Sequence, residues 1–396
     1  MTLSRNQIQI LSLISVSMLA HITLGGGRVA ASLYMLQNGG SEALAGIAYS
    51  GYCLLPAILS LLMGRWVDRV GTRQVMRASL MIMVVGLVVP ALWPSMATIL
   101  FSSAVCGFGF ASYMLAANVA VSMMPVAHDG ERVGMLGWLA MGNSVAAVGG
   151  PAITGLTIDH GGFASAYGLM ALIVSGGLVA SYLVDVPGAG APRARQKGEG
   201  SVVKLVFGNP RILRIYLLAM CTSMLYDGFS FMTPVLGHER GFSATTIGMI
   251  MSAFAVGTFA VRAVLPWLSR RLPEWRMLTL AFGFAATAFL LLPLAADSLM
   301  HAALGFVFGL SAGASQPNIF SLIYRAMPEG KAGEGAGLRS MMGNAVGLTA
   351  PSLYGAVSAL SGAAPVFIGI GCIAALASWQ SDRGLRAARA TAPAAP

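Results

Sequence analysis

Twelve long apolar stretches, separated by short polar connections, constrain this chain more than any other feature. Each comes near the roughly 20 apolar residues that an α-helix needs to cross a bilayer. With 56% hydrophobic and only 10% charged residues in a length of 396, the chain has too little polar surface for a soluble globule of its size. We therefore predict an all-α membrane protein with twelve transmembrane helices, at 8–36, 43–63, 75–95, 97–124, 133–157, 164–185, 212–237, 243–268, 276–295, 299–327, 336–358 and 363–381.

The basic residues lie in alternate connections. Apart from Arg28, Arg240 and Arg262, the 24 Lys and Arg residues fall in the two termini and in the connections near 65–77, 132, 193–214, 270–276 and 325–339. Such an excess of positive charge is typical of cytoplasmic loops. We predict that both termini are cytoplasmic and that the protein lies in the inner, or plasma, membrane. Because the net charge of +10 is divided among these connections, we expect no nucleic-acid partner.

Internal similarity divides the chain into two halves about 200 residues apart. The matching segments occur in the same order in each half, at 41–46 and 243–248, at Met124-Pro125 and Met327-Pro328, and at Met141-Gly142-Asn143 and Met342-Gly343-Asn344. Between the halves, 186–207 is rich in Pro, Gly, Ala and basic residues and has no apolar helical stripe. We predict two six-helix bundles at 1–185 and 212–381, a cytoplasmic linker at 186–211 and a disordered cytoplasmic tail at 382–396.

A charged segment at 64–73 separates the second and third apolar stretches. Its sequence, GRWVDRVGTR, fits the pattern G-x-x-x-D-R-x-G-x-R and resembles the loop between helices 2 and 3 of the major facilitator superfamily. That resemblance implies two parallel six-helix repeats that enclose a central substrate path and rock about it. It also implies that Asp68 meets the positive N-terminal end of helix 11, near Gly335, and holds the cytoplasmic side shut. The predicted gating residues of this segment are Gly64, Asp68, Arg69, Gly71 and Arg73.

The fifth apolar stretch contains Gly149, Gly150 and Pro151, followed by Gly155. This segment resembles the glycine-proline motif of the family's drug/proton antiporters, so we predict that Gly150 and Pro151 also take part in gating. Close helix packing is the alternative, since small residues let helices approach, and Ala350-Pro351 repeats the motif in part. The family's helix 4 arginine is absent, because Ser103 stands four residues ahead of Gly107.

Three charged residues lie inside apolar stretches: Arg28, Asp227 and Arg262. A charge at the bilayer centre costs about 2.5–3.5 kcal/mol on insertion scales, so each should face a cavity or a partner. The repeat places Asp227 about one turn from the level of Arg28, and we predict an ion pair between them. The pair either fastens the halves together or couples transport to protons through Asp227. Arg262 either faces the path, where it would favour an anionic substrate, or extends toward the cytoplasmic end.

Other polar residues at depth are candidates for lining the path. They include Tyr49 and Tyr52. Helices 1, 4, 7 and 10 line the path in the family that the chain resembles, which favours Tyr34, Tyr113, Asn118, Tyr226, Gln316 and Asn318 over Asn143 and Asn344. For each tyrosine, packing is an equal alternative. The four cysteines lie in apolar stretches, and the glycine-rich segments lack the Lys-Ser/Thr of a nucleotide site. We predict no metal, no cofactor and no enzymatic activity.

The resemblance and the buried charges predict a secondary active transporter. We expect it to move a small organic solute across the cytoplasmic membrane by alternating access, as a monomer that exchanges its substrate for protons in the direction of efflux. A proton-coupled importer of an organic anion is the alternative within transport. A non-transporting membrane receptor of the same fold is the alternative from another class.

Overall fold

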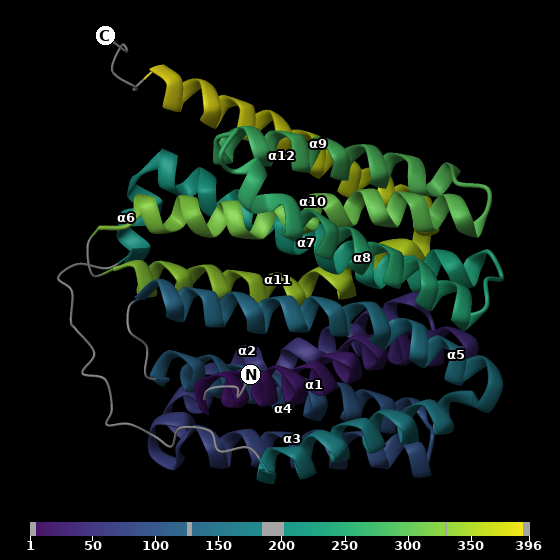
Figure 1. Ribbon diagram of the computed structural model, residues 1–396. Helices are drawn as coiled ribbons and strands as arrows, with labels where there is room; N and C mark the ends of the chain where they lie inside the picture. Colours follow the sequence, from purple (N-terminus) through teal and green to yellow (C-terminus); the bar gives the residue numbers. More distant parts are fainter. Residues whose placement is uncertain (1–4, 125–128, 184–201, 329–330, 391–396) are drawn as a thin grey trace.

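The computed structural model describes residues 5–124, 129–183, 202–328 and 331–390, and these residues form helices and short turns without any strand. The long helices run side by side along one direction (Figure 1). They are α1 (Arg5–Gln37), α2 (Glu42–Val70), α3 (Thr72–Leu92), α4 (Met96–Met123), α5 (Asp129–Leu183), α6 (Val202–Gly208), α7 (Pro210–Glu239), α8 (Ala244–Leu268), α9 (Glu274–Leu291), the 3-10 turn η1 (Leu292–Leu294), α10 (Ser298–Ala326), α11 (Ala332–Ser361) and α12 (Ala363–Ala390).

Ten helices within the described ranges are long and apolar enough to cross a membrane. One of them, Trp138–Tyr182, has 45 residues and contains two passes, because α5 reverses direction at Gly162, where φ is 74°. Helix α11 is not among the ten, since its many glycine, serine and charged residues lower its hydropathy, yet it has 30 residues and packs along α2 and α7. When Trp138–Tyr182 is counted as two passes and α11 is added, the described helices make the twelve passes that the sequence predicts.

The segment predicted as a charged loop at 64–73 is almost entirely helical. Helix α2 continues to Val70, α3 begins at Thr72, and only Gly71 lies outside a helix. Gly71 has φ 92°, a backbone conformation that L side chains rarely adopt and that glycine reaches without a steric penalty. The predicted helical hairpin is present, but its connection is shorter than the predicted 64–74, because the charged residues form the last turns of α2 and the chain reverses at one glycine.

Two other predicted non-helical segments also contain helix. In the linker, Val202–Gly208 forms α6, and Val202 and Val206 are buried. In the predicted tail, α12 continues to Ala390, where Arg386 pairs with Asp382 one turn before it at 2.7 Å. The remainder of both segments, 184–201 and 391–396, lies outside the described residues.

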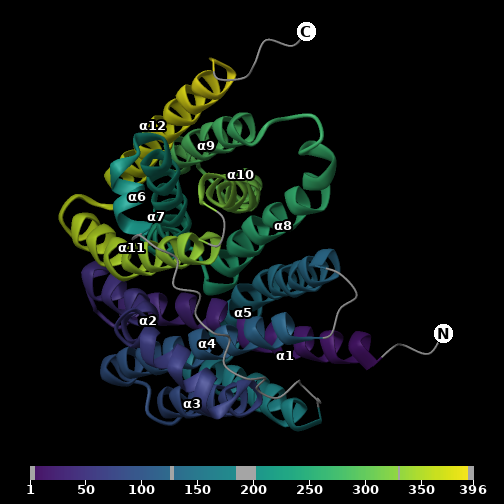
Figure 2. The same cartoon turned by 90° about the vertical axis from the view of Figure 1, so that its left-hand side faces the viewer.

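Figure 2 looks along the helices and shows α1–α5 gathered on one side and α6–α12 on the other. Two pairs of helices make most of the contact between these halves: α2 with α11, and α5 with α8. We call the end of the molecule that carries Arg65–Arg73 and Arg270–Arg276 the basic end. The other end holds the starts of α2 and α8 and the end of α11.

Candidate functional site

Close contacts between the halves lie toward the end opposite the basic end. A Cβ atom on Gly46 of α2 would overlap the backbone of Pro351 on α11, and one on Gly248 of α8 would overlap the backbone of Pro151 on α5. In the same way, Gly355 meets the backbone of Glu42. These positions are equivalent in the two repeats, so two similar contacts close this end. We call them the α2–α11 seam and the α5–α8 seam.

Each seam also contains a serine hydrogen bond. The Ser352 hydroxyl donates to the Ser50 hydroxyl at 3.0 Å in the α2–α11 seam. In the α5–α8 seam, Ser252 donates to the carbonyl of Val148 at 2.5 Å. Ser50 and Ser252 are equivalent in the repeats. Because backbone and small side chains alone make these contacts, the helices approach as closely as small residues permit, and this end of the molecule is closed.

Asp159 lies in α5 shortly before Gly162, where the helix reverses. It makes a contact in the α5–α8 seam that has no counterpart among the described residues of the α2–α11 seam. Its carboxylate accepts hydrogen bonds from the backbone N–H groups of Ala244 at 3.0 Å and Thr245 at 2.7 Å, which are the first residues of α8. Burial would raise the pKa of Asp159, but the hydrogen bonds from Thr245, Ala244 and Ser243 outweigh it and lower the pKa below its ordinary value. A carboxylate of one half therefore caps the positive end of a helix of the other half.

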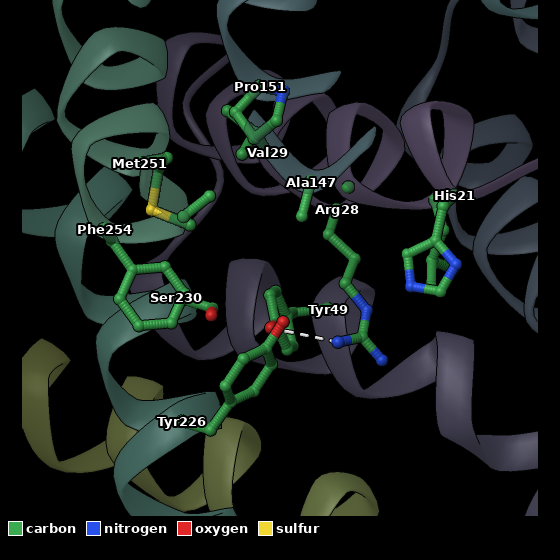
Figure 3. A pocket seen from close by; sticks show the side chains of 13 residues that line it. His21, Arg28, Val29, Tyr49, Ala147, Pro151, Tyr226, Ser230, Met251 and Phe254 are labelled. Atoms are coloured by element: carbon green, nitrogen blue, oxygen red, sulfur yellow. Dashed lines mark hydrogen bonds between the residues drawn. The ribbon is translucent and has the colours of Figure 1, made fainter. Parts of the chain in front are cut away.

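A pocket of about 70 Å³ lies between the halves, on the inner side of the two seams. It is formed by residues of α1, α2, α5, α7 and α8, and we call it the central pocket (Figure 3). Its polar lining consists of His21, Arg28, Tyr49, Tyr226 and Ser230. Pro151, whose carbonyl faces Gly248 in the α5–α8 seam, also lines it. The pocket and one seam thus share a residue.

Arg28 is the centre of the polar contacts in the central pocket. It pairs with Asp227 of the other half, with 3.8 Å between Nη1 and Oδ1, and the two side chains are 18% and 10% exposed. Its Nη1 also donates to the Tyr49 hydroxyl at 3.2 Å (Figure 3), and its Nη2 donates to Cys53 Sγ at 3.6 Å. The guanidinium lies 4.8 Å from the centre of the Tyr49 ring. The ion pair predicted from the sequence is therefore present.

Arg262 lies nearer the basic end, and it contacts both halves. Its Nη1 donates to the Ser144 hydroxyl of α5, and its Nη2 donates to Gln316 Oε1 of α10 at 3.3 Å. Its guanidinium therefore faces the space between the halves, and Arg262 also lines a pocket at the basic end. Tyr226 lines the central pocket together with Arg28. Two guanidinium groups and one carboxylate thus give this region a net positive charge.

The other predicted lining residues divide into two groups. Tyr226 lines the central pocket, Gln316 binds Arg262, and Asn318 lines a separate pocket at the basic end. Tyr34 is buried against Phe163, Tyr113 is bonded to Ser17 inside its own half at 3.1 Å, and Asn118 donates to the carbonyl of Met114 on its own helix. The second group of three does not meet the Arg28–Asp227 pair in this structure.

The predicted gating residues also lie in different places. Gly150 packs against the backbone of Ile22, and Pro151 is part of the α5–α8 seam. Asp68 and Arg69 are exposed at the basic end, Arg73 is half-buried, and Gly64 has nothing within 4 Å of a Cβ position. Gly335 receives a hydrogen bond on its carbonyl from Tyr216 at 2.9 Å. In the part of the chain that the structure describes, no hydrogen bond joins Asp68 to α11, so its gating role stays a prediction.

Sequence reasoning missed several contacts of the two arginines. Tyr49 was a candidate lining residue but was not expected to bind Arg28, Cys53 was interpreted only as one of the cysteines in apolar stretches, and Ser144 carries no signal of its own in the sequence. A helical spacing of four puts Tyr49 and Cys53 on one face of α2. That spacing, read together with Arg28, is the signal that would have found them.

A family model described as Major Facilitator Superfamily matches residues 13–351. The fold is similar to that of the peptide transporter POT in complex with sulfate, with a TM-score of 0.78 and 16% identity over 98% of this chain and 99% of that one. It is also similar to a mutant of the nucleoside transporter NupG (0.76, 13% identity, 95% and 99% covered). A third match is a bacterial homolog of the human lysosomal transporter Spinster, inward-facing and unoccupied (0.77, 14% identity, 100% of both chains). At these identities the likeness establishes the fold.

Proposed function

The chain belongs to the Major Facilitator Superfamily, and from this premise we propose that it is a secondary active transporter in which Asp227 carries the coupling proton. It moves a small organic solute across the inner membrane by alternating access, as a monomer with both termini in the cytoplasm. The basic end is then the cytoplasmic end. One closed end and pockets toward the other are the arrangement expected of one state of such a cycle.

The Arg28–Asp227 pair is the observation that carries the proposal. It joins the two halves at 3.8 Å beside the central pocket, which Arg28 lines, and neither ion is well solvated. While Asp227 is charged, its carboxylate satisfies Arg28 and excludes another anion. When Asp227 takes up a proton, the guanidinium loses its counter-ion, and a substrate carboxylate or phosphate that binds it in a forked geometry restores the balance. Proton and anion therefore bind together.

Binding of proton and anion together corresponds to cotransport in one direction. The charge of the region supports an anionic substrate, since Arg28 and Arg262 exceed Asp227 in the space between the halves. A cationic substrate would have to displace Arg28 from Asp227 and then share the space between the halves with both guanidinium groups. Cotransport of an organic anion with a proton is thus the mode that the geometry favours.

Efflux in exchange for protons is the second candidate. It is favoured by Gly149, Gly150 and Pro151, whose sequence resembles the motif of the family's antiporters and which lie beside the α5–α8 seam. In this mode a neutral or cationic substrate competes with the proton for Asp227. Because substrate and proton exclude each other, each is carried in the opposite direction.

Proteoliposomes with a pH gradient separate the two modes. The measurement follows dissipation of the gradient after the addition of organic anions, cations and neutral drugs on either side, for wild type and for Asp227→Asn. Asp382→Asn is the matched control, since Asp382 pairs with Arg386 at the exposed end of α12. Cotransport predicts that anions carry protons toward their own destination, and exchange predicts proton movement the opposite way. If Asp227→Asn moves protons at the wild-type rate, Asp227 is not the coupling group.

A further inference from the structure

A second pocket, of about 510 Å³, lies between α5, α8 and α10 on the basic side of the central pocket. We call it the vestibule pocket. Its polar groups are Ser144, Arg262 and Gln316, and its remaining wall is largely apolar and aromatic, with Trp138, Met141, Phe259, Pro317 and Phe320. Its volume falls in the range of small-molecule sites, which combine an apolar wall with a few polar groups in the same way.

The vestibule pocket is distinct from the central pocket but lies next to it along the path. On α8 the central pocket is lined by Met251 and Phe254, whereas the vestibule pocket is lined by Phe259 and Arg262. Helix α8 runs toward the basic end, so the second pair lies one to two turns closer to that end. Helix α5 gives the same order, because it runs the other way and places Trp138 and Ser144 before Ala147 and Pro151.

The guanidinium of Arg262 is positioned from both halves. Gln316 on α10 accepts from Nη2 at 3.3 Å, and Ser144 on α5 accepts from Nη1. Both acceptors are neutral, so the charge of Arg262 has no carboxylate partner among the bonds that hold it. A second cation lies close by, since Arg339 of α11 stacks on the Phe320 ring at 4.7 Å. Arg262 therefore gives the polar side of the pocket its positive charge, and Arg339 adds a second positive charge beside the Phe320 wall.

We propose that the vestibule pocket is a second binding site, for an organic anion with an aromatic body, through which the substrate of the central pocket passes. This inference rests on the proposed transport function for the identity of its ligand as a substrate. The anionic group replaces the neutral Ser144 oxygen on Arg262, and a charged acceptor binds a guanidinium more strongly than a neutral one. The aromatic body packs between Trp138 on α5 and Phe320 on α10.

This arrangement predicts a particular selectivity. A small anion without an apolar body binds only through Arg262, and a neutral aromatic compound binds only by packing against the aromatic wall. An aryl carboxylate gains both. Because Trp138 belongs to one half and Phe320 to the other, a ligand that fills the pocket touches both halves. It therefore binds most tightly when the basic end has the spacing seen here.

Binding is measured on the full chain in lipid nanodiscs without any gradient, with 4-nitrobenzoate as the probe and the neutral 4-nitrobenzyl alcohol as its matched control. Nitroaromatic compounds quench tryptophan emission on contact, so Trp138 reports occupancy, and Trp138→Phe identifies its share of the signal. The variants are Arg262→Gln, Ala140→Phe, which adds bulk to the pocket without removing a partner of Arg262, and Arg28→Gln, which removes the guanidinium of the central pocket. Size-exclusion chromatography and circular dichroism verify the fold of each.

We expect saturable quenching of Trp138 by the anion and at least tenfold weaker binding of the alcohol. Loss of a charge-assisted contact in Arg262→Gln should raise the half-saturating concentration about tenfold, and Ala140→Phe should do the same. Arg28→Gln should change it less than twofold. Equal loss in Arg28→Gln would mean one continuous site and overturn the proposal, as would wild-type binding in either Arg262→Gln or Ala140→Phe. Absence of transport in proteoliposomes with vestibule binding intact would instead count against the proposed function alone.

Discussion

Arg28 and Asp227 form an ion pair, and this contact takes the place of the hydration that each charge would have in water. Their side chains are 18% and 10% exposed and belong to opposite halves. Removal of one member of a buried ion pair leaves an uncompensated charge, which costs about 3–5 kcal/mol, whereas replacement of both can be nearly neutral. We predict that Arg28→Gln and Asp227→Asn each lower the apparent melting temperature in detergent, that Asp227→Asn lowers it more, and that the double variant recovers most of the loss.

Asp227→Asn is expected to have the larger effect, because the unpaired Asp227 carboxylate of Arg28→Gln can become neutral by taking up a proton, whereas the unpaired Arg28 guanidinium of Asp227→Asn cannot lose its charge. A comparison of the melting temperatures of the two single variants therefore tests whether the protein tolerates an unpaired Asp227 better than an unpaired Arg28. Tyr49 and Cys53 remain as acceptors for Arg28 in Asp227→Asn, and these contacts reduce the cost of that variant. Strictly additive losses in the double variant would show that the two side chains do not interact.

The sequence indicated the charged pair but not its surroundings. An arginine and an aspartate inside apolar stretches are conspicuous because a bilayer penalises each of them, and the repeat placed them at similar depths. Ser144 gives no such signal, since serine is common in transmembrane helices and its contact with Arg262 depends on how α5 and α8 are placed. Tyr34 and Tyr113 are equally polar, yet both are buried against residues of their own half, and Asn118 is exposed and donates to the carbonyl of Met114 on its own helix.

At the scale of helices, the glycines of the two seams hold the closed end together. A Cβ atom on Gly248 would overlap the carbonyl of Pro151, and backbone cannot move aside as a flexible side chain can. Overpacking costs about 1–3 kcal/mol, and here separation of the halves relieves it. We therefore predict that Gly248→Val shifts the protein toward a state that is open at this end. Gly168→Val is the matched control, because Gly168 has nothing within 4 Å of its Cβ position.

Spin labels at His160→Cys and Ser361→Cys, in a background without Cys53, Cys106, Cys221 and Cys372, measure this opening. Both positions are exposed at the closed end, at the ends of α5 and α11 in opposite halves. Electron–electron double resonance should give a longer distance in Gly248→Val and an unchanged one in Gly168→Val. The same distance distribution in both variants would mean that the α5–α8 seam does not set the spacing of the halves.

Asp159 provides a separate test of the α5–α8 seam, because it caps α8 from the other half. Loss of a cap costs about 0.5–2 kcal/mol, and this exposed one should lie at the low end. Asp159→Ala should therefore lengthen the same spin-label distance in a fraction of molecules. Since hydrogen bonds lower the pKa of Asp159, its contribution is present above the ordinary carboxyl pKa and is lost only as the pH falls through the lowered value. The effect of the variant should thus be constant between pH 8 and pH 5.

Hydropathy predicted which helices are present, but it did not predict the residues at which they end. An apolar stretch reports where the bilayer is, but a helix continues beyond it for as long as its backbone hydrogen bonds and side chains permit. Helices α2 and α12 extend into charged sequence at Val70 and Ala390 for this reason. Helix α11 shows the converse, since its polar face packs against α2 and α7 and lowers the hydropathy of a helix that is nonetheless full length.

For the whole molecule, the two ends differ in a way that the sequence repeat does not predict. The two repeats contribute equivalent glycines and serines to the closed end. At the basic end, only α2 carries the charged segment with Asp68, and its repeat counterpart after α8 reads Ser269-Arg270-Arg271. A state closed at the basic end therefore has a different set of contacts available, and Asp68 is free to contribute to it because its side chain is exposed here.

Asp68→Asn should slow the transport cycle and leave ligand affinity in the present state nearly unchanged. The exposed carboxylate makes no contact with the central or vestibule pocket, so its loss should not alter binding to this state. A carboxylate at the N-terminal end of a helix contributes about 0.3–1 kcal/mol, and its loss from the state closed at the basic end would lower that population by about two- to fivefold. Initial transport rates and equilibrium binding of the same substrate, compared with those of Asp382→Asn, test this expectation. A large loss of affinity with an unchanged rate would place Asp68 in binding instead of gating.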